Sequence, residues 1–192
     1  NFEATLALFT QDVFGMTVED NFLVFATVGA VLMFAGGMYR PLAKKGNEFA
    51  LMRVGVVLML LGLGGLAGVA VGGAGPDRGD GLKPAFYAAM AVAVIGFAFV
   101  NPSVSALVSK SAPADRQGEV LGVNQAFASL GRILGPLAGS ILFQAGGMHT
   151  LPYLAAVLTL IGVAGLLPRV RAAEVFDSPQ RHEGGTGGHE VS

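Results

Sequence analysis

The sequence predicts an all-α membrane protein, a polytopic helix bundle with five complete spans and one truncated span. Hydrophobic residues make up 53% of the chain and charged residues only 13%, and the mean hydropathy is +0.62. A soluble domain carries about 25% charged residues. The apolar residues also form long runs that reach or approach the roughly 17–25 residues of a membrane-spanning helix. Composition and run length together indicate helices that cross a bilayer.

Five apolar runs, joined by short polar segments, are the expected complete spans. They are residues 22–39, 49–72, 84–109, 120–145 and 150–168. Residues 1–9 are expected to be the end of a sixth span, truncated where the chain begins. Residues 1–168 would then form one bundle. Residues 169–192 contain the glycine-rich stretch 184–188 and are expected to be a disordered tail.

Several classes of protein do not suit this composition. The chain has no Cys, which rules out a disulfide framework or a thiolate metal site. Its three His residues fall in a predicted loop and the tail without ligand-like partners, so we expect no metal site. The net charge is −1 and no basic stripe is present, so the sequence shows no sign of a nucleic-acid binding surface. Because Asn1 is not an initiator Met and no signal peptide precedes the first span, we expect a fragment whose N-terminal part is missing.

Lysine and arginine alternate between the two sides of the predicted membrane. One side has nine of them: Arg40, Lys44, Lys45, Arg53, Lys110, Arg116, Arg169, Arg171 and Arg181. The connections on the other side have only Arg78 and Lys83. Since basic residues favour the cytoplasm, we expect the basic loop 40–48, the loop 110–119 and the C-terminal tail to be cytoplasmic. Tyr39, Tyr87 and Tyr153 lie near span ends and are expected at the headgroup level.

Glycines recur at helical spacing in the span 120–145. Gly131, Gly135 and Gly139 are four residues apart, so they share one helix face and allow a neighbouring backbone to approach closely. Pro136 removes one backbone hydrogen bond and is expected to bend the helix. Gly64, Gly68 and Gly72 repeat the same spacing in the span 49–72, where close helix packing is again expected.

Arg132 is the charged residue nearest the middle of a complete span. A central arginine costs about 2.5–3.5 kcal/mol on insertion scales, so it should face protein or a water-filled cavity. Gln125 lies seven residues earlier on nearly the same face, with Ser129 beside it. The stripe is either part of a substrate or proton pathway, or structural. In the structural alternative, Arg132 bonds carbonyls freed by Pro136 or pairs with an acid elsewhere.

Two further polar residues fall within predicted spans. Glu3 would lie near the centre of the truncated span, as a proton carrier, a cation-binding carboxylate or a partner of a distant basic residue. Asn101 precedes Pro102, which is expected to break the helical ladder. Asn101 could line a cavity at that bend, although a plain kink is the commoner outcome.

The pattern Gly122-x8-Gly131-x3-Gly135-Pro136-x2-Gly139 resembles the antiporter motif of drug:proton antiporters in the major facilitator superfamily, with Ser140 in place of the last glycine. Further matching stretches are NPSVSALVSKSAP at 101–113, QGEVLGVNQ at 117–125, RILGP at 132–136 and PY at 152–153. Residues 1–171 therefore look like the C-terminal six-helix half of such a transporter, close to the tetracycline-resistance type. The spans would be helices seven (partial) to twelve.

The same chain could also be laid on the N-terminal half, because the two halves are repeats of each other. In that alignment the basic loop of Arg40, Lys44 and Lys45 would carry the family's loop motif, but the Asp of that motif and its Gly-Arg-Arg are missing. The span 84–109 also lacks the expected Arg-x-x-Gln-Gly pattern. Both departures favour the C-terminal half.

The resemblance implies a proton antiporter that exports a small drug-like molecule by alternating access. Glu3, Asn101, Gln125 and Arg132 would be polar lining, and Phe2 and Phe97 would be aromatic contacts. Gly122, Gly131, Gly135, Pro136 and Gly139 would form the tight, bent helix contact that limits leakage. The implied partners are the missing N-terminal half, the bilayer and a small-molecule substrate, with protons as coupling ion and no cofactor.

The implied location is the cytoplasmic membrane of a bacterium. Two other functions stay open from the residues alone. A membrane scaffold or sensor could keep this fold without transporting anything. A membrane-embedded enzyme would need paired acids, a His-Glu-x-x-His motif or a nucleophile with partners, and the sequence has no such constellation. We therefore assign no catalytic residue.

Overall fold

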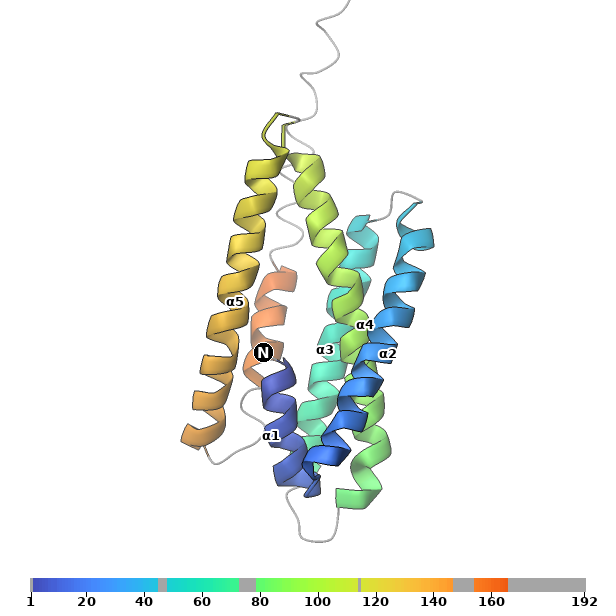
Figure 1. Ribbon diagram of the computed structural model, residues 1–192, viewed down its shortest axis with the longest axis vertical. Helices are drawn as coiled ribbons and strands as arrows, with labels where there is room; N and C mark the ends of the chain where they lie inside the picture. The colour runs from blue at the N-terminus through green and yellow to red at the C-terminus, as the bar shows by residue number, and fades with distance from the viewer. Residues whose placement is uncertain (1, 45–47, 73–78, 114, 147–153, 166–192) are drawn as a thin grey trace, which may run out of the picture.

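The computed structural model is a bundle of helices that run broadly along one axis (Figure 1). It describes residues 2–44, 48–72, 79–113, 115–146 and 154–165, and side chains for 6–44, 48–72, 81–113, 115–141 and 154–165. The helices are α1 (Phe2–Phe14), α2 (Val18–Ala43), α3 (Glu48–Gly72), α4 (Gly79–Ser111), α5 (Gln117–Gly146) and a shorter apolar helix, Leu154–Gly165. The described residues contain no strand, and the predicted all-α membrane bundle is confirmed.

Three of the described helices, α2, α3 and α4, are long and apolar enough to cross a membrane. α5 is long enough, with 30 residues, but the polar side chains of its first half make it less apolar. The last predicted span is described only over Leu154–Gly165, and the predicted tail 169–192 lies outside the described residues. The truncated span 1–9 continues as a helix to Phe14.

A tight turn and a capping box set the junction between α1 and α2. Gly15 has a φ of +61°, a left-handed conformation that glycine adopts without strain. The Thr17 backbone N–H donates to Asp20 Oδ2 at 2.9 Å, and the Asp20 N–H donates to Thr17 Oγ1 at 3.3 Å. These bonds satisfy backbone donors that a helix start leaves open. α2 consequently begins at Val18, four residues before the apolar run that predicted it.

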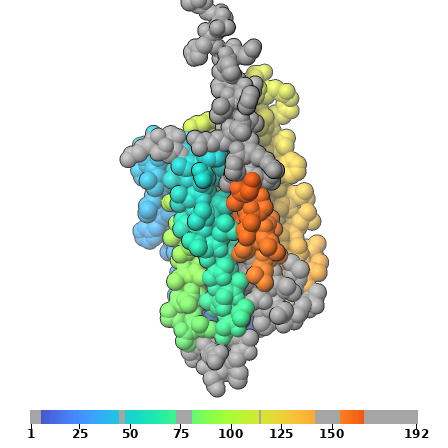
Figure 2. Space-filling model, turned by 180° about the vertical axis from the view of Figure 1, so that it is seen from behind, coloured from blue at the N-terminus to red at the C-terminus, as the bar shows by residue number. Residues whose placement is uncertain are grey.

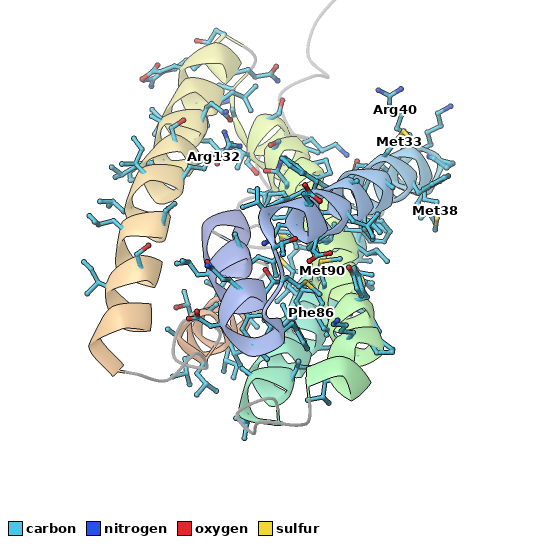
Figure 3. The ribbon with its side chains drawn as sticks, turned by 60° about the horizontal axis from the view of Figure 1, so that its bottom comes forward. Met33, Met38, Arg40, Phe86, Met90 and Arg132 are labelled. Carbon is cyan, nitrogen blue, oxygen red and sulfur yellow. The ribbon has the colours of Figure 1, made fainter. Side chains whose placement is uncertain are left out.

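The main apolar core joins α1, α2, α3 and α4. Phe9, Leu66, Phe86 and Met90 are fully buried in it, and the Phe9 and Phe86 rings stack with centroids 5.7 Å apart. Figure 3 shows Phe86 and Met90 inside the bundle. Leu154–Gly165 covers the side of this core between α3 and α5 (Figures 1 and 2).

α3 and α4 form the most extensive helix pair of the structure. A Cβ atom at Gly62 would lie 2.3 Å from the Ala93 backbone nitrogen, and one at Gly96 would lie 2.6 Å from the Gly55 carbonyl oxygen. Only glycine allows backbones this close. Of the three glycines predicted to pack closely, Gly64 and Gly68 do not take part, and a Cβ at Gly72 would make only an ordinary contact with Leu82 Cδ1 at 3.4 Å. A Cβ at Gly64 or Gly68 would meet nothing within 4 Å, because these residues lie on another face of α3.

A second, smaller apolar cluster lies between the C-terminal part of α2 and the middle of α4. Ala35, Tyr39, Ala98 and Phe99 are its buried members. Tyr39 is only 9% exposed, and Ser103 Oγ donates to its hydroxyl oxygen at 3.1 Å. Its polar end is thus satisfied by α4, and its position at the headgroup level stays a prediction. Tyr87 is half-buried, and Tyr153 lies outside the described residues.

Candidate functional site

The candidate site is the polar stripe on α5. Gln125, Ser129 and Arg132 are all exposed, as the predicted stripe requires. Figure 3 shows Arg132 on the side of α5 that faces the rest of the bundle. Asn124, one residue from Gln125, is half-buried and points about 100° away around the helix. Most of α5 between residues 122 and 138 is exposed as well, so the role of the stripe, from Gln125 to Arg132, stays a prediction.

Arg132 makes no ion pair and no hydrogen bond with any side chain or carbonyl that the structure describes. Pro136 has no N–H and so frees the carbonyl four residues earlier, which belongs to Arg132 itself. The guanidinium does not bond carbonyls near this proline. That structural alternative therefore finds no support in the described residues, whereas pairing with an acid elsewhere stays open.

Asn101 and Phe97 occupy one face of α4, a single helical turn apart. Both are exposed, Phe97 by 48%. α4 stays helical through Pro102, so the predicted break is instead the loss of a single backbone bond. The Asn101 backbone carbonyl accepts a hydrogen bond from Ser105 Oγ at 3.2 Å. The Asn101 side-chain amide makes no hydrogen bond with the described residues. The geometry suits polar lining but does not bring Asn101 into bonding contact with Arg132.

Two predicted site residues lie where only the backbone is described. Phe2 and Glu3 begin α1, and their side chains fall outside the described residues. The pathway role of Glu3 and the aromatic role of Phe2 both stay predictions.

The glycine motif of α5 is only partly covered. A Cβ at Gly122 or Gly131 would meet nothing within 4 Å, whereas Gly139 is buried, and Gly135 and Pro136 are half-buried. Large apolar side chains, including Phe127, Ile133 and Leu137, are also exposed on α5. No described helix makes the predicted close contact at Gly122 and Gly131. That contact stays a prediction about a helix beyond the described residues.

The basic loop begins at the end of α2. Arg40 and Lys44 are exposed there, as Figure 3 shows for Arg40, and Lys45 is outside the described residues. At the same end, Lys110 Nζ lies 2.6 Å from Glu48 Oε1 and ties the end of α4 to the start of α3. Sequence reasoning missed this ion pair and also the Tyr39–Ser103 bond. Both residues of each pair lie near span ends, but nothing in the sequence indicates which ends meet.

The part of the chain that the structure describes holds no group of three or more His, Asp or Glu side chains able to bind a metal ion. The polar groups of the candidate site are instead a cation, two amides and a hydroxyl, distributed over α4 and α5. Such groups can bind a solute or orient a charged one. They do not form a nucleophile with an adjacent base, the arrangement that covalent catalysis requires.

Comparison with known proteins identifies the family. The family model of the Major Facilitator Superfamily matches residues 2–125 and, in a second register, residues 53–186. The chain belongs to the major facilitator superfamily. Members of this superfamily are transporters, so the protein is an integral membrane protein of a transporter family. The two matched ranges overlap, and they do not distinguish the N-terminal from the C-terminal half of such a transporter.

Three curated relatives come from Bacillus subtilis (strain 168). Multidrug resistance protein 1 is 28% identical over 170 residues, which cover 85% of this chain and 39% of the relative. The uncharacterized MFS-type transporter YttB is 34% identical over 94 residues, 47% of this chain and 24% of its own. The uncharacterized MFS-type transporter YuxJ is 38% identical over 65 residues, 34% of this chain and 17% of its own. The chain thus spans about two fifths or less of these relatives, and no solved structure matches it significantly.

Proposed function

We propose that this chain is the C-terminal six-helix half of a secondary transporter of the tetracycline-resistance type, which exports a small drug-like molecule in exchange for protons. The observation that carries the proposal is Arg132, an exposed cation on a long helix with no bonding partner among the described residues. Intramembrane charges are expensive and usually mark solute or ion pathways. The match to a multidrug resistance protein over 85% of the chain supports the drug-like substrate class.

In the proposed mechanism, the polar stripe forms one wall of a central cavity, and an N-terminal half supplies the other wall. Arg132 provides a fixed positive charge, because arginine is not deprotonated in proteins. The proton therefore has to travel on other titratable side chains, of which Glu3 is this chain's candidate. Gln125 and Asn101 supply amide donors and acceptors, and Phe97 offers an apolar surface to the substrate. Rocking of one half against the other would expose the cavity to each side in turn.

We place the basic loop and the C-terminus in the cytoplasm, and the protein in the cytoplasmic membrane of a bacterium. The excess of Lys and Arg on one side supports this orientation. Because the proposed cavity needs walls from both halves, residues 1–192 alone should not transport. Vesicles that contain only these residues should show no gradient-driven uptake, and uptake above that of empty vesicles would contradict the two-half arrangement.

The principal test uses inverted vesicles with the complete transporter and measures proton-driven movement of cationic dyes and tetracycline-like drugs. Arg132→Ala should lower the rate at least tenfold at equal expression. Arg53→Ala is the matched control, because Arg53 is an exposed arginine near the start of α3 and should retain transport. Equal rates for Arg132→Ala and wild type would make Arg132 structural. Failure of the wild type to move any of these compounds would remove the drug assignment.

A further inference from the structure

The bond between Ser103 and Tyr39, like the bond from Thr10 Oγ1 on α1 to Asn21 Oδ1 on α2, joins the hydroxyl of one helix to a side chain of another. Other hydroxyls bond within their own helix. Thr27, Ser105, Ser111 and Thr159 each donate to the carbonyl four residues earlier in their own helix. Ser103 instead donates across to α2, and its side chain is fully buried. A hydroxyl that donates to its own helix keeps that bond whether or not a neighbouring helix is present. The Ser103–Tyr39 bond, in contrast, exists only while α2 and α4 stay together.

Both helices are weakened beside this bond. Pro102 precedes Ser103 and has no N–H for the Ala98 carbonyl, and Pro41 follows Tyr39 and has none for the Gly37 carbonyl. Gly36 and Gly37 add two residues of low helix propensity, and a Cβ at either would meet nothing within 4 Å, so close packing does not account for them. Kinks in helices concentrate at such positions. The bond thus joins two helices where each bends most easily.

The position of the bond also matters for α5. Figure 1 shows that α4 crosses α2 and that its C-terminal part then leads toward α5. The apolar support at this level is the small cluster of Ala35, Tyr39, Ala98 and Phe99, in which the Tyr39 and Phe99 rings have centroids 6.2 Å apart. A bend at Pro102 would therefore carry the end of α4, and α5 with it, away from α2, and any movement of that end relative to α3 would also open the Lys110–Glu48 pair.

We propose that Tyr39 and Ser103 form a latch that holds α2 against α4 beside a proline hinge at Pro102. While the bond is made, the hinge is closed and the small cluster is dry. When it breaks, α2 and the end of α4 separate, and the cluster becomes accessible. This inference concerns a conformational equilibrium of the bundle and does not depend on the identity of the transported molecule.

The test measures how fast a buried thiol reacts in the complete transporter, with any cysteine outside this chain replaced. This chain has no Cys, so Ala98→Cys introduces its only thiol, at a position 9% exposed within the cluster. The latch predicts that adding Tyr39→Phe speeds maleimide labelling of this thiol roughly threefold to tenfold, the range expected for loss of one buried hydrogen bond. Ser103→Ala should have the same effect, and the double variant no larger one, because each change removes the same bond.

Two controls separate the latch from general loosening of the fold. Ala67→Cys places the thiol in the main core on α3, where Tyr39→Phe should leave the labelling rate unchanged. Thr27→Val removes a hydroxyl that bonds only its own helix and should leave the Ala98→Cys rate unchanged. The proposal is overturned if Tyr39→Phe does not change the Ala98→Cys rate, if it speeds both thiols equally, or if the effects of Tyr39→Phe and Ser103→Ala add.

Discussion

The closest helix crossing of the bundle predicts opposite responses to the same substitution at two glycines of α3. Gly62→Ala would place a Cβ atom 2.3 Å from the Ala93 nitrogen and 2.6 Å from its Cα and Cβ, where ordinary contact begins at 3.4 Å. The backbones of α3 and α4 would have to separate by about 1 Å, and overpacking of this kind typically costs about 1–3 kcal/mol. Gly64→Ala introduces the same methyl group where nothing lies within 4 Å.

Comparing the two variants isolates the cost of the clash, because replacing glycine with alanine raises helix propensity equally at both positions, by up to about 1 kcal/mol. Gly64→Ala should therefore be neutral or stabilising by about 0.4–1 kcal/mol. Gly62→Ala should be about 1–3 kcal/mol less stable than Gly64→Ala. The assay is reversible unfolding of the purified protein in mixed detergent micelles, followed by loss of helical circular dichroism. Equal unfolding free energies for the two variants would refute the assigned register between α3 and α4.

Three further substitutions test the ends and the core of the bundle. Thr17→Ala removes the cap of α2 and should cost about 1 kcal/mol, seen as faster amide hydrogen exchange in its first turn. Lys110→Ala breaks the pair with Glu48, and because Lys110 is 60% exposed, the loss of unfolding free energy should stay below about 1 kcal/mol. This loss should become smaller in about 1 M salt, and a loss that salt does not reduce would contradict an ionic origin. Phe86→Ala empties a fully buried site beside Phe9 and should cost about 3–5 kcal/mol in the same unfolding assay, and a cost below 1 kcal/mol would contradict that packing.

The existence of the long helices was predictable because lipid leaves a spanning chain few alternatives. A backbone in hydrocarbon must satisfy its own hydrogen bonds, so an apolar run of sufficient length becomes a helix. The residues at which the helices start were harder to predict from the sequence. α2 begins four residues early because Thr17 and Asp20 cap it. α4 begins at Gly79, so Pro84 lies within the helix and removes one of its backbone bonds.

Helix pairing was not predictable from spacing alone. A four-residue period shows that Gly64 and Gly68 share a face, but it does not show which face meets a neighbour. The glycines of α3 that lie closest to α4 are Gly55, Gly62 and Gly65, and the residues of α4 that they meet are recognisable only once both helices are placed. The bond between Tyr39 and Ser103 was not predictable for the same reason, because the two residues are sixty-four positions apart.

The candidate site shows how far local pattern extends. The helical period placed Gln125 and Arg132 on one face, and both are indeed exposed. The residues that bond with them could not be predicted, because such a partner can lie on a distant segment, and the helical period relates only residues of the same helix. The same limit applies to Glu3, whose side chain lies outside the described residues.

The distribution of close contacts sets which parts of the bundle can move. Between helices in lipid the hydrophobic effect contributes little, so small residues and polar bonds determine how firmly helices associate. α3 and α4 are joined by both kinds of contact, the close backbone approach at Gly62 and the Lys110–Glu48 ion pair. α2 adds the Tyr39–Ser103 bond, whereas α5 leaves Gly122 and Gly131 open to a neighbour. A helix with an open glycine face can exchange partners at less cost than one locked by backbone contact, so α5 should move against the other helices more easily than α3 moves against α4. α2 lacks such a backbone contact, so its separation from the end of α4 is opposed mainly by the Tyr39–Ser103 bond and the small cluster around it.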